Sequence, residues 1–92
     1  MNRGLRAVML FLLNRRYIGG KHFPEKNLVK AKAIYFQKRE RRNFEKEYKE
    51  AVNELFLLRS KKRTGKGSDW HISLNPNKLK ELLEMLEEND KE

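Results

Sequence analysis

Four cations surround a flexible turn in the stretch FLLRSKKRTGKGSDWHISLNP, residues 56–76. They are Lys61, Lys62, Arg63 and Lys66. Cations this close together repel one another unless a polyanion binds them, and the glycines of the TGKG turn let the backbone approach phosphate groups. The pattern therefore predicts contact with the phosphates of a nucleic acid. The alternative is a solvated hairpin whose lysines only protect its edge strands from aggregation.

The residues on either side of this turn predict a β-hairpin. Apolar and polar residues alternate after the turn, so we expect strands over about 56–62 and 69–74. Trp70 alternates with Ile72 and Leu74, which predicts that its indole packs in the core with them. The alternative for Trp70 is a base-stacking role, as in proteins that bind single strands.

Three helices are predicted before the hairpin. Apolar residues at helical spacing indicate a first helix over about 2–16 and a third over about 38–55. Between them, Pro24 and Glu25 suit the first turn of a short second helix, because proline tolerates that position and a carboxylate favours the positive end of the helix dipole.

A fourth helix is predicted after the hairpin, where Asn75 can cap it and Pro76 can occupy its first position. Its apolar stripe consists of Leu79, Leu82, Leu83 and Leu86. This stripe can close the core or pair with a second copy, and we expect a homodimer. The acidic tail, residues 87–92, is expected to fray. The chain thus predicts one α+β domain, mainly α, over residues 1–92.

The positive charge is concentrated in the first two thirds of the chain. The net charge is +9, but residues 1–66 carry 19 Lys and Arg against 6 Asp and Glu, whereas residues 67–92 carry 3 against 7. Such a field attracts polyanions: DNA, RNA or an anionic membrane surface. The alternative is a network of ion pairs, as in proteins of heat-loving organisms, but balanced networks do not require this excess.

Several classes of function lack support in the sequence. There is no cysteine, which excludes disulfides and thiolate metal sites, and His22 and His71 do not have metal-ligand spacing. The apolar run 7–13 is far shorter than the ~20 residues of a membrane span, and no small-residue cleavage site follows it. No catalytic motif is present, since TGKGS is too short for a phosphate-binding loop. We expect a cytoplasmic protein without cofactor, metal or enzymatic activity.

The order helix, helix, helix, strand, turn, strand, helix resembles the winged helix-turn-helix family, in particular small archaeal winged-helix proteins. The resemblance covers residues 5–86 and depends on YIGGKHFPEKNL, EYKEAVNELFLLRSKK and TGKGSDWHISLNP. It implies that the third helix enters a DNA major groove and that the hairpin, the wing, contacts an adjacent groove or the backbone. The expected function is a DNA-binding transcription regulator. An RNA-binding module and a protein-interaction module are the alternatives.

Other candidate nucleic-acid contacts lie before the wing. In the winged-helix arrangement the second helix crosses the backbone, so Lys26 and Lys30 are expected to clamp a phosphate. A cationic cluster at the start of the third helix is expected to contact phosphates and consists of Lys38, Arg39, Arg41 and Arg42.

The third helix also carries residues that could contact the backbone or read base edges. These are Arg41, Arg42, Lys46, Lys49 and Asn53, and arginine and asparagine are the usual readers of guanine and adenine. Glutamates interleave with them, and a carboxylate near a groove repels phosphate. Glu45 and Lys49 have the stabilising i, i+4 order, so a salt-bridged exposed face is the alternative.

Overall fold

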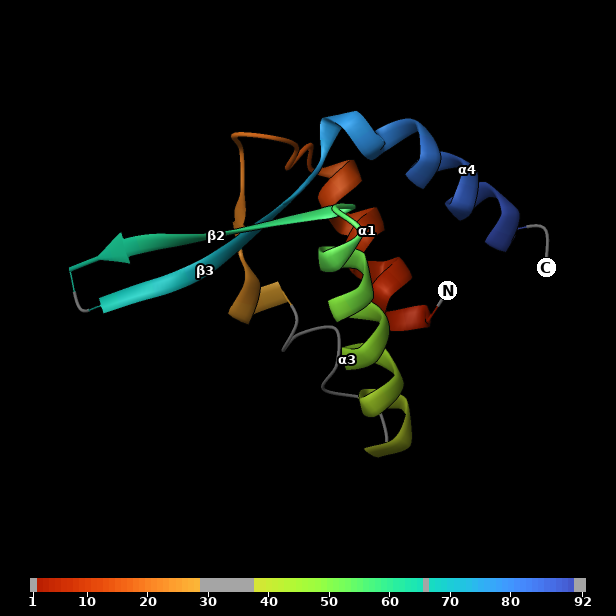
Figure 1. The fold of residues 1–92 in the computed structure, drawn as a ribbon, viewed down its shortest axis with the longest axis horizontal. Coiled ribbons are helices and arrows are strands. Elements are labelled where there is room, and N and C mark those ends of the chain that lie inside the picture. Colours follow the sequence, from red (N-terminus) through yellow and green to blue (C-terminus); the bar gives the residue numbers. More distant parts are fainter. Residues whose placement is uncertain (1, 29–37, 66, 91–92) are drawn as a thin grey trace.

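The computed structural model describes residues 2–28, 38–65 and 67–90 and shows a mainly helical α+β fold (Figure 1). Residues 25–28 are also helical. The elements, in chain order, are α1 (Arg3–Asn14), β1 (Phe23–Pro24), α3 (Lys38–Asn53), β2 (Leu57–Thr64), β3 (Gly67–Leu74), the 3-10 turn η1 (Pro76–Lys78) and α4 (Leu79–Asp90). The predicted first and third helices, the hairpin and the last helix are confirmed.

Hydrogen bonds explain where α1 begins and where α1 and α3 end. The Asn2 side chain caps α1 by accepting from the backbone N–H of Gly4 at 2.8 Å. Both helices end in a Schellman pattern, with a residue of positive φ just past the last turn: Arg16 at 58° and Leu55 at 65°. The end of α3 turns the chain directly into β2.

The sheet has three antiparallel strands in the order β1-β3-β2. The hairpin register runs from Leu57 opposite Leu74 to Thr64 opposite Gly67, so both strands are longer at the turn than the sequence predicted. Gly67 has a φ of 141°, a value that favours glycine. Pro24 was predicted in a helix and instead pairs with His71 in β1. An edge strand accommodates proline because the missing N–H is not needed there.

The core lies where α1, α3 and α4 meet the base of the sheet. Beyond that base, the hairpin projects away from the helices (Figure 1). The buried apolar residues are Leu5, Val8, Met9, Leu12, Leu28, Phe44, Ala51, Phe56, Leu57, Ile72, Leu74, Leu82 and Leu86. Among the helices in the described part of the chain, none has the length and apolar character needed to cross a membrane.

The apolar stripe of α4 mainly closes this core. Leu82 and Leu86 are 1% and 5% exposed, and Leu79 packs partly buried against them, whereas Leu83 is 46% exposed. The expected homodimer stays a prediction, but Leu82 and Leu86 are already buried within one copy and are not exposed to take part in its interface. Leu83 is the member of the stripe that faces solvent.

Replacing Leu82 and Leu83 separately distinguishes these roles. We expect Leu82→Ala to lower the free energy of unfolding by about 2–5 kcal/mol, because it opens a cavity in the core. Leu83→Ala, the matched surface control, should change it by less than about 0.5 kcal/mol. Urea unfolding followed by circular dichroism measures both values. Equal losses for the two variants would contradict the packing described here.

Candidate nucleic-acid interface

A concave surface separates the C-terminal half of α3 from the hairpin. It consists of two adjoining hollows of about 180 and 210 Å³, which share Tyr48, Lys49 and Arg59. Val52 and Asn53 complete one of them. We call this surface the α3–hairpin groove. Two of its residues, Lys49 and Asn53, were predicted to contact nucleic acid, and both side chains are exposed.

The groove is held open by three side chains from three segments. The Glu25 carboxylate accepts hydrogen bonds from Arg59 Nε at 2.7 Å and Arg59 Nη2 at 2.8 Å, and from the Tyr48 hydroxyl at 2.6 Å. The arginine pair is bidentate and charge-assisted, the strong and directional form of this interaction. We call Glu25, Tyr48 and Arg59 the Glu25 clamp. It links residues 25–28, α3 and β2, which fixes the angle between helix and hairpin.

The clamp also determines the charge of its members. Burial, together with the hydrogen bond to Glu25, raises the pKa of Tyr48, so its hydroxyl stays a neutral donor. Arg59 was not a predicted site residue, and its charge is largely neutralised by Glu25. One signal in the sequence pointed to this pair: Glu25 is the only acidic residue before Glu40, in a segment full of cations.

The cations of the hairpin divide between its two faces. Lys61 and Arg63 alternate with Arg59 along β2, and the Lys61 Nζ lies 5.7 Å from the centre of the Trp70 ring. Lys62 points to the opposite face and lies opposite Asp69 across the strands. All three side chains are exposed. Lys61 and Arg63 thus continue the face that borders the α3–hairpin groove, whereas Lys62 does not.

The indole of Trp70 does not pack in the core, so that prediction is wrong. It is 42% exposed, although Ile72 and Leu74 on the same face are fully buried. The hairpin extends beyond the helices, so the apolar row leaves the core before it reaches Trp70 (Figure 1). The Arg59 guanidinium lies over the ring, 4.2 Å from its centre.

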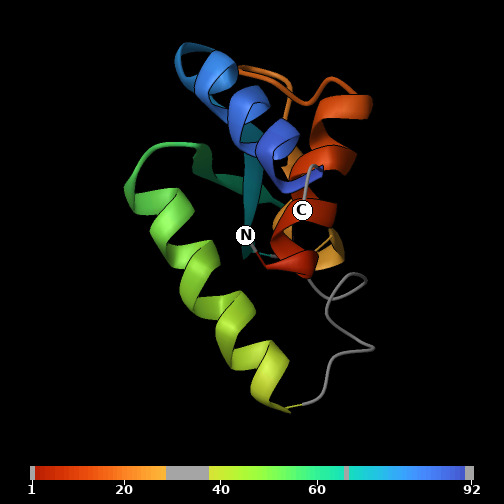
Figure 2. The same cartoon turned by 90° about the vertical axis from the view of Figure 1, so that its right-hand side faces the viewer.

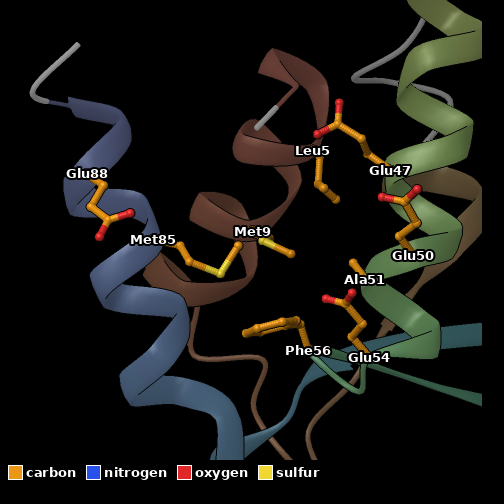
Figure 3. A pocket seen from close by; sticks show the side chains of 9 residues that line it. All are labelled: Leu5, Met9, Glu47, Glu50, Ala51, Glu54, Phe56, Met85 and Glu88. Atoms are coloured by element: carbon orange, nitrogen blue, oxygen red, sulfur yellow. The ribbon is translucent and has the colours of Figure 1, made fainter.

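Two glutamates of α3, and Glu54 just past its end, face away from the groove. Glu47, Glu50 and Glu54 line a separate pocket of about 220 Å³ between α1, α3 and α4, together with Glu88 (Figure 3). Its apolar floor consists of Leu5, Met9, Ala51, Phe56 and Met85. The interleaved charges of α3 are therefore sorted in space: Glu47, Glu50 and Glu54 line this acidic-rimmed pocket. Glu45 remains beside the groove.

The other predicted contacts lie outside the groove. Arg39, Arg41 and Arg42 are exposed in the first turns of α3, at the end that extends away from the other helices (Figures 1 and 2). Lys38 begins the same helix. Lys46 is exposed further along α3, and Lys26 is exposed beside Glu25. Lys30 and Lys66 lie outside the described residues.

Two histidines far apart in the sequence meet at the edge of the sheet. The Nδ1 atoms of His22 and His71 lie 2.9 Å apart, because β1 pairs with β3 beside them. One ring must donate and the other accept, which requires at least one of them to be neutral. Desolvation lowers the pKa of His71, and the nearby His22 and Lys62 lower it further. The carboxylate of Asp69 acts in the opposite direction. Within the described residues, no cluster of three or more metal-binding side chains is present.

Comparisons with known proteins do not assign this chain to a family. No protein family, no curated protein and no solved structure matches it. A function therefore has to be inferred from the groove, the exposed indole and the charges beside them.

The Glu25 clamp predicts non-additive losses of stability. Tyr48→Phe removes one hydrogen bond to a carboxylate and should cost about 1.5–3 kcal/mol, and Glu25→Gln should cost a similar amount. The double variant should lose less than the two single losses together, because both act on one network. Glu45→Gln, on the same helix but outside the clamp, is the control. Chemical unfolding of the four variants measures this coupling, and strict additivity would contradict it.

The histidine pair predicts a dependence of stability on pH. Because the pKa of His71 is lower in the folded chain, the unfolded chain binds more protons below the ordinary histidine value of ~6.5. Folding stability should therefore fall as the pH decreases from about 7.5 to 5. The variant His71→Phe should lose less stability over that interval. Thermal unfolding at both pH values tests this, and parallel losses in the two proteins would contradict it.

Proposed function

We propose that this chain is a winged-helix protein that binds duplex DNA and acts as a transcription regulator. In this proposal α3 is the helix that enters the major groove and the β2–β3 hairpin is the wing. The observation that carries the proposal is the α3–hairpin groove, which Lys49 and Asn53 border on one side and Lys61 and Arg63 extend on the other.

The electrostatics of the groove support a polyanionic ligand. Glu25 neutralises Arg59, whereas Lys61 and Arg63 lie beyond the clamp and are exposed. Glu47, Glu50 and Glu54 line the pocket on another side of α3. A phosphate backbone along the groove would therefore meet Lys49 and the exposed cations of the hairpin, with Glu45 as the carboxylate that is not part of the clamp.

The length of α3 indicates how many cations could contact phosphates of the bound DNA. Asn53 ends the helix near the base of the hairpin, and Arg39, Arg41 and Arg42 lie at its far end, roughly 20 Å away along a helix of 16 residues. Side chains this far apart would contact different phosphates. If six to eight cations contact phosphate, the slope of log K against log salt is about −5 to −7.

An RNA-binding module is the second candidate. The observation that favours it is the exposed Trp70 beside cations, because aromatic side chains that stack on unpaired bases are common in proteins that recognise RNA. Competition between duplex DNA, double-stranded RNA and single-stranded RNA at one salt concentration separates the two candidates.

Charge removal from the wing tests the proposed mode of binding. We expect the double variant Lys61→Ala and Arg63→Ala to weaken binding to duplex DNA of any sequence. Each lost phosphate contact should flatten the salt slope by about 0.9, so the double variant should flatten it by about 1.8. Fluorescence anisotropy of a labelled duplex over a series of salt concentrations measures both effects.

A charge-matched control is available far from the wing. Arg3→Ala combined with Lys80→Ala removes two exposed cations from α1 and α4. It should leave the slope nearly unchanged, since neither residue borders the groove. If the wing variant and this control behave alike, the hairpin takes no part in binding.

A further inference from the structure

Trp70 is a large apolar side chain in a position where folding does not cover it. Its ring lies on the inner face of the hairpin, past the last buried residue of β3, Ile72. A solvent-exposed indole forfeits much of the stabilisation that burial would give it. The residues around the indole therefore indicate which kind of ligand could cover it.

The ring is supported from one direction and bordered by charge. The Arg59 guanidinium lies 4.2 Å from its centre, and the two hydrogen bonds to Glu25 hold that guanidinium in place. The Lys61 ammonium lies 5.7 Å from the same centre, and Arg63 follows on the same face of β2. A planar apolar surface is thus presented in a fixed position among cations.

This combination fits one chemical class of ligand. A nucleobase offers a flat π surface to the indole and carries a phosphate that the neighbouring cations can bind. An apolar protein surface would cover the ring equally well but would leave Lys61 beside uncharged atoms, which costs solvation free energy. The bases of an intact duplex stack on one another, so the indole can reach a base only where it is unpaired.

We propose that Trp70 stacks on an unpaired nucleobase, so that a duplex with a single-stranded end binds more tightly than a blunt duplex. This inference rests on the proposed function, because Lys61 and Arg63 must hold the strand's phosphates. Arg59 is a positioning residue: it orients the indole and does not bind the ligand's phosphates, since Glu25 already neutralises it.

The intrinsic fluorescence of the chain tests the proposal without any substitution. The sequence contains one tryptophan, so emission excited at the red edge of the indole absorption, where tyrosine does not absorb, reports on Trp70 alone. Titration with oligothymidylate or oligouridylate should quench the emission, because stacking on a base places the indole against another π system. An abasic strand of equal length carries the same phosphates without bases, and at equal occupancy it should quench far less. A blunt duplex should also quench less than the single strands.

Two variants measure how much stacking on Trp70 contributes to the affinity for single strands. Trp70→Leu should weaken binding of the base-bearing single strands by about 5- to 150-fold, the range for one lost stacking contact. Trp70→Phe, which keeps an aromatic ring, should recover most of that loss. Both variants should bind the blunt duplex and the abasic strand within about twofold of the parent chain. Their thermal unfolding confirms that they fold.

The outcomes separate this inference from the proposed function. Base-dependent quenching and a base-dependent loss of affinity in Trp70→Leu support it. Salt-dependent binding of duplex and single strands, with equal quenching by the abasic strand, overturns the stacking role and leaves the proposed function intact. Failure of every strand to bind at low ionic strength overturns both.

Discussion

The carboxylate of Glu25 is the interaction on which the arrangement of the molecule's binding surface depends. It joins the helical residues 25–28 to α3 through Tyr48 and to β2 through Arg59. Without it, the hairpin would be attached to the helices mainly through its base, because its outer half extends beyond the core. The clamp thus sets both the width of the α3–hairpin groove and the position of the Arg59 guanidinium under Trp70.

The apolar core and the Glu25 clamp fix different parts of the fold. Apolar burial fixes α1, α4 and the base of the sheet, where Ile72 and Leu74 are fully enclosed. Where that burial ends, along the inner face of the hairpin, polar contacts hold the strands in position. A charge-assisted network restricts geometry more than apolar packing does, because its hydrogen bonds are directional. The functional surface proposed for this chain lies in the part of the molecule that these directional hydrogen bonds hold in place.

Local sequence signals predicted the elements but not the contacts between them. The helices and hairpin followed from periodicity and from Asn75 and Pro76, whose effects act within a few residues. By contrast, Glu25 and Arg59 are 34 residues apart, and His22 and His71 are 49 apart. The pairing of β1 with β3 brings the histidines together, and no local pattern indicated that strand. Alternation placed Trp70 on the correct face without showing where the core ends.

The sorting of charge around α3 gives the molecule a permanent electric dipole moment. Carboxylates collect around the pocket between α1, α3 and α4 (Figure 3), whereas β2, the strand that carries Lys61, Lys62 and Arg63, extends in a different direction (Figure 1). In the field of a polyanion such a charge distribution experiences a torque as well as an attraction. The carboxylate-lined pocket would turn away from the polyanion during diffusion, before any side chain touches its target, and added salt would weaken this alignment over a distance of about 10 Å.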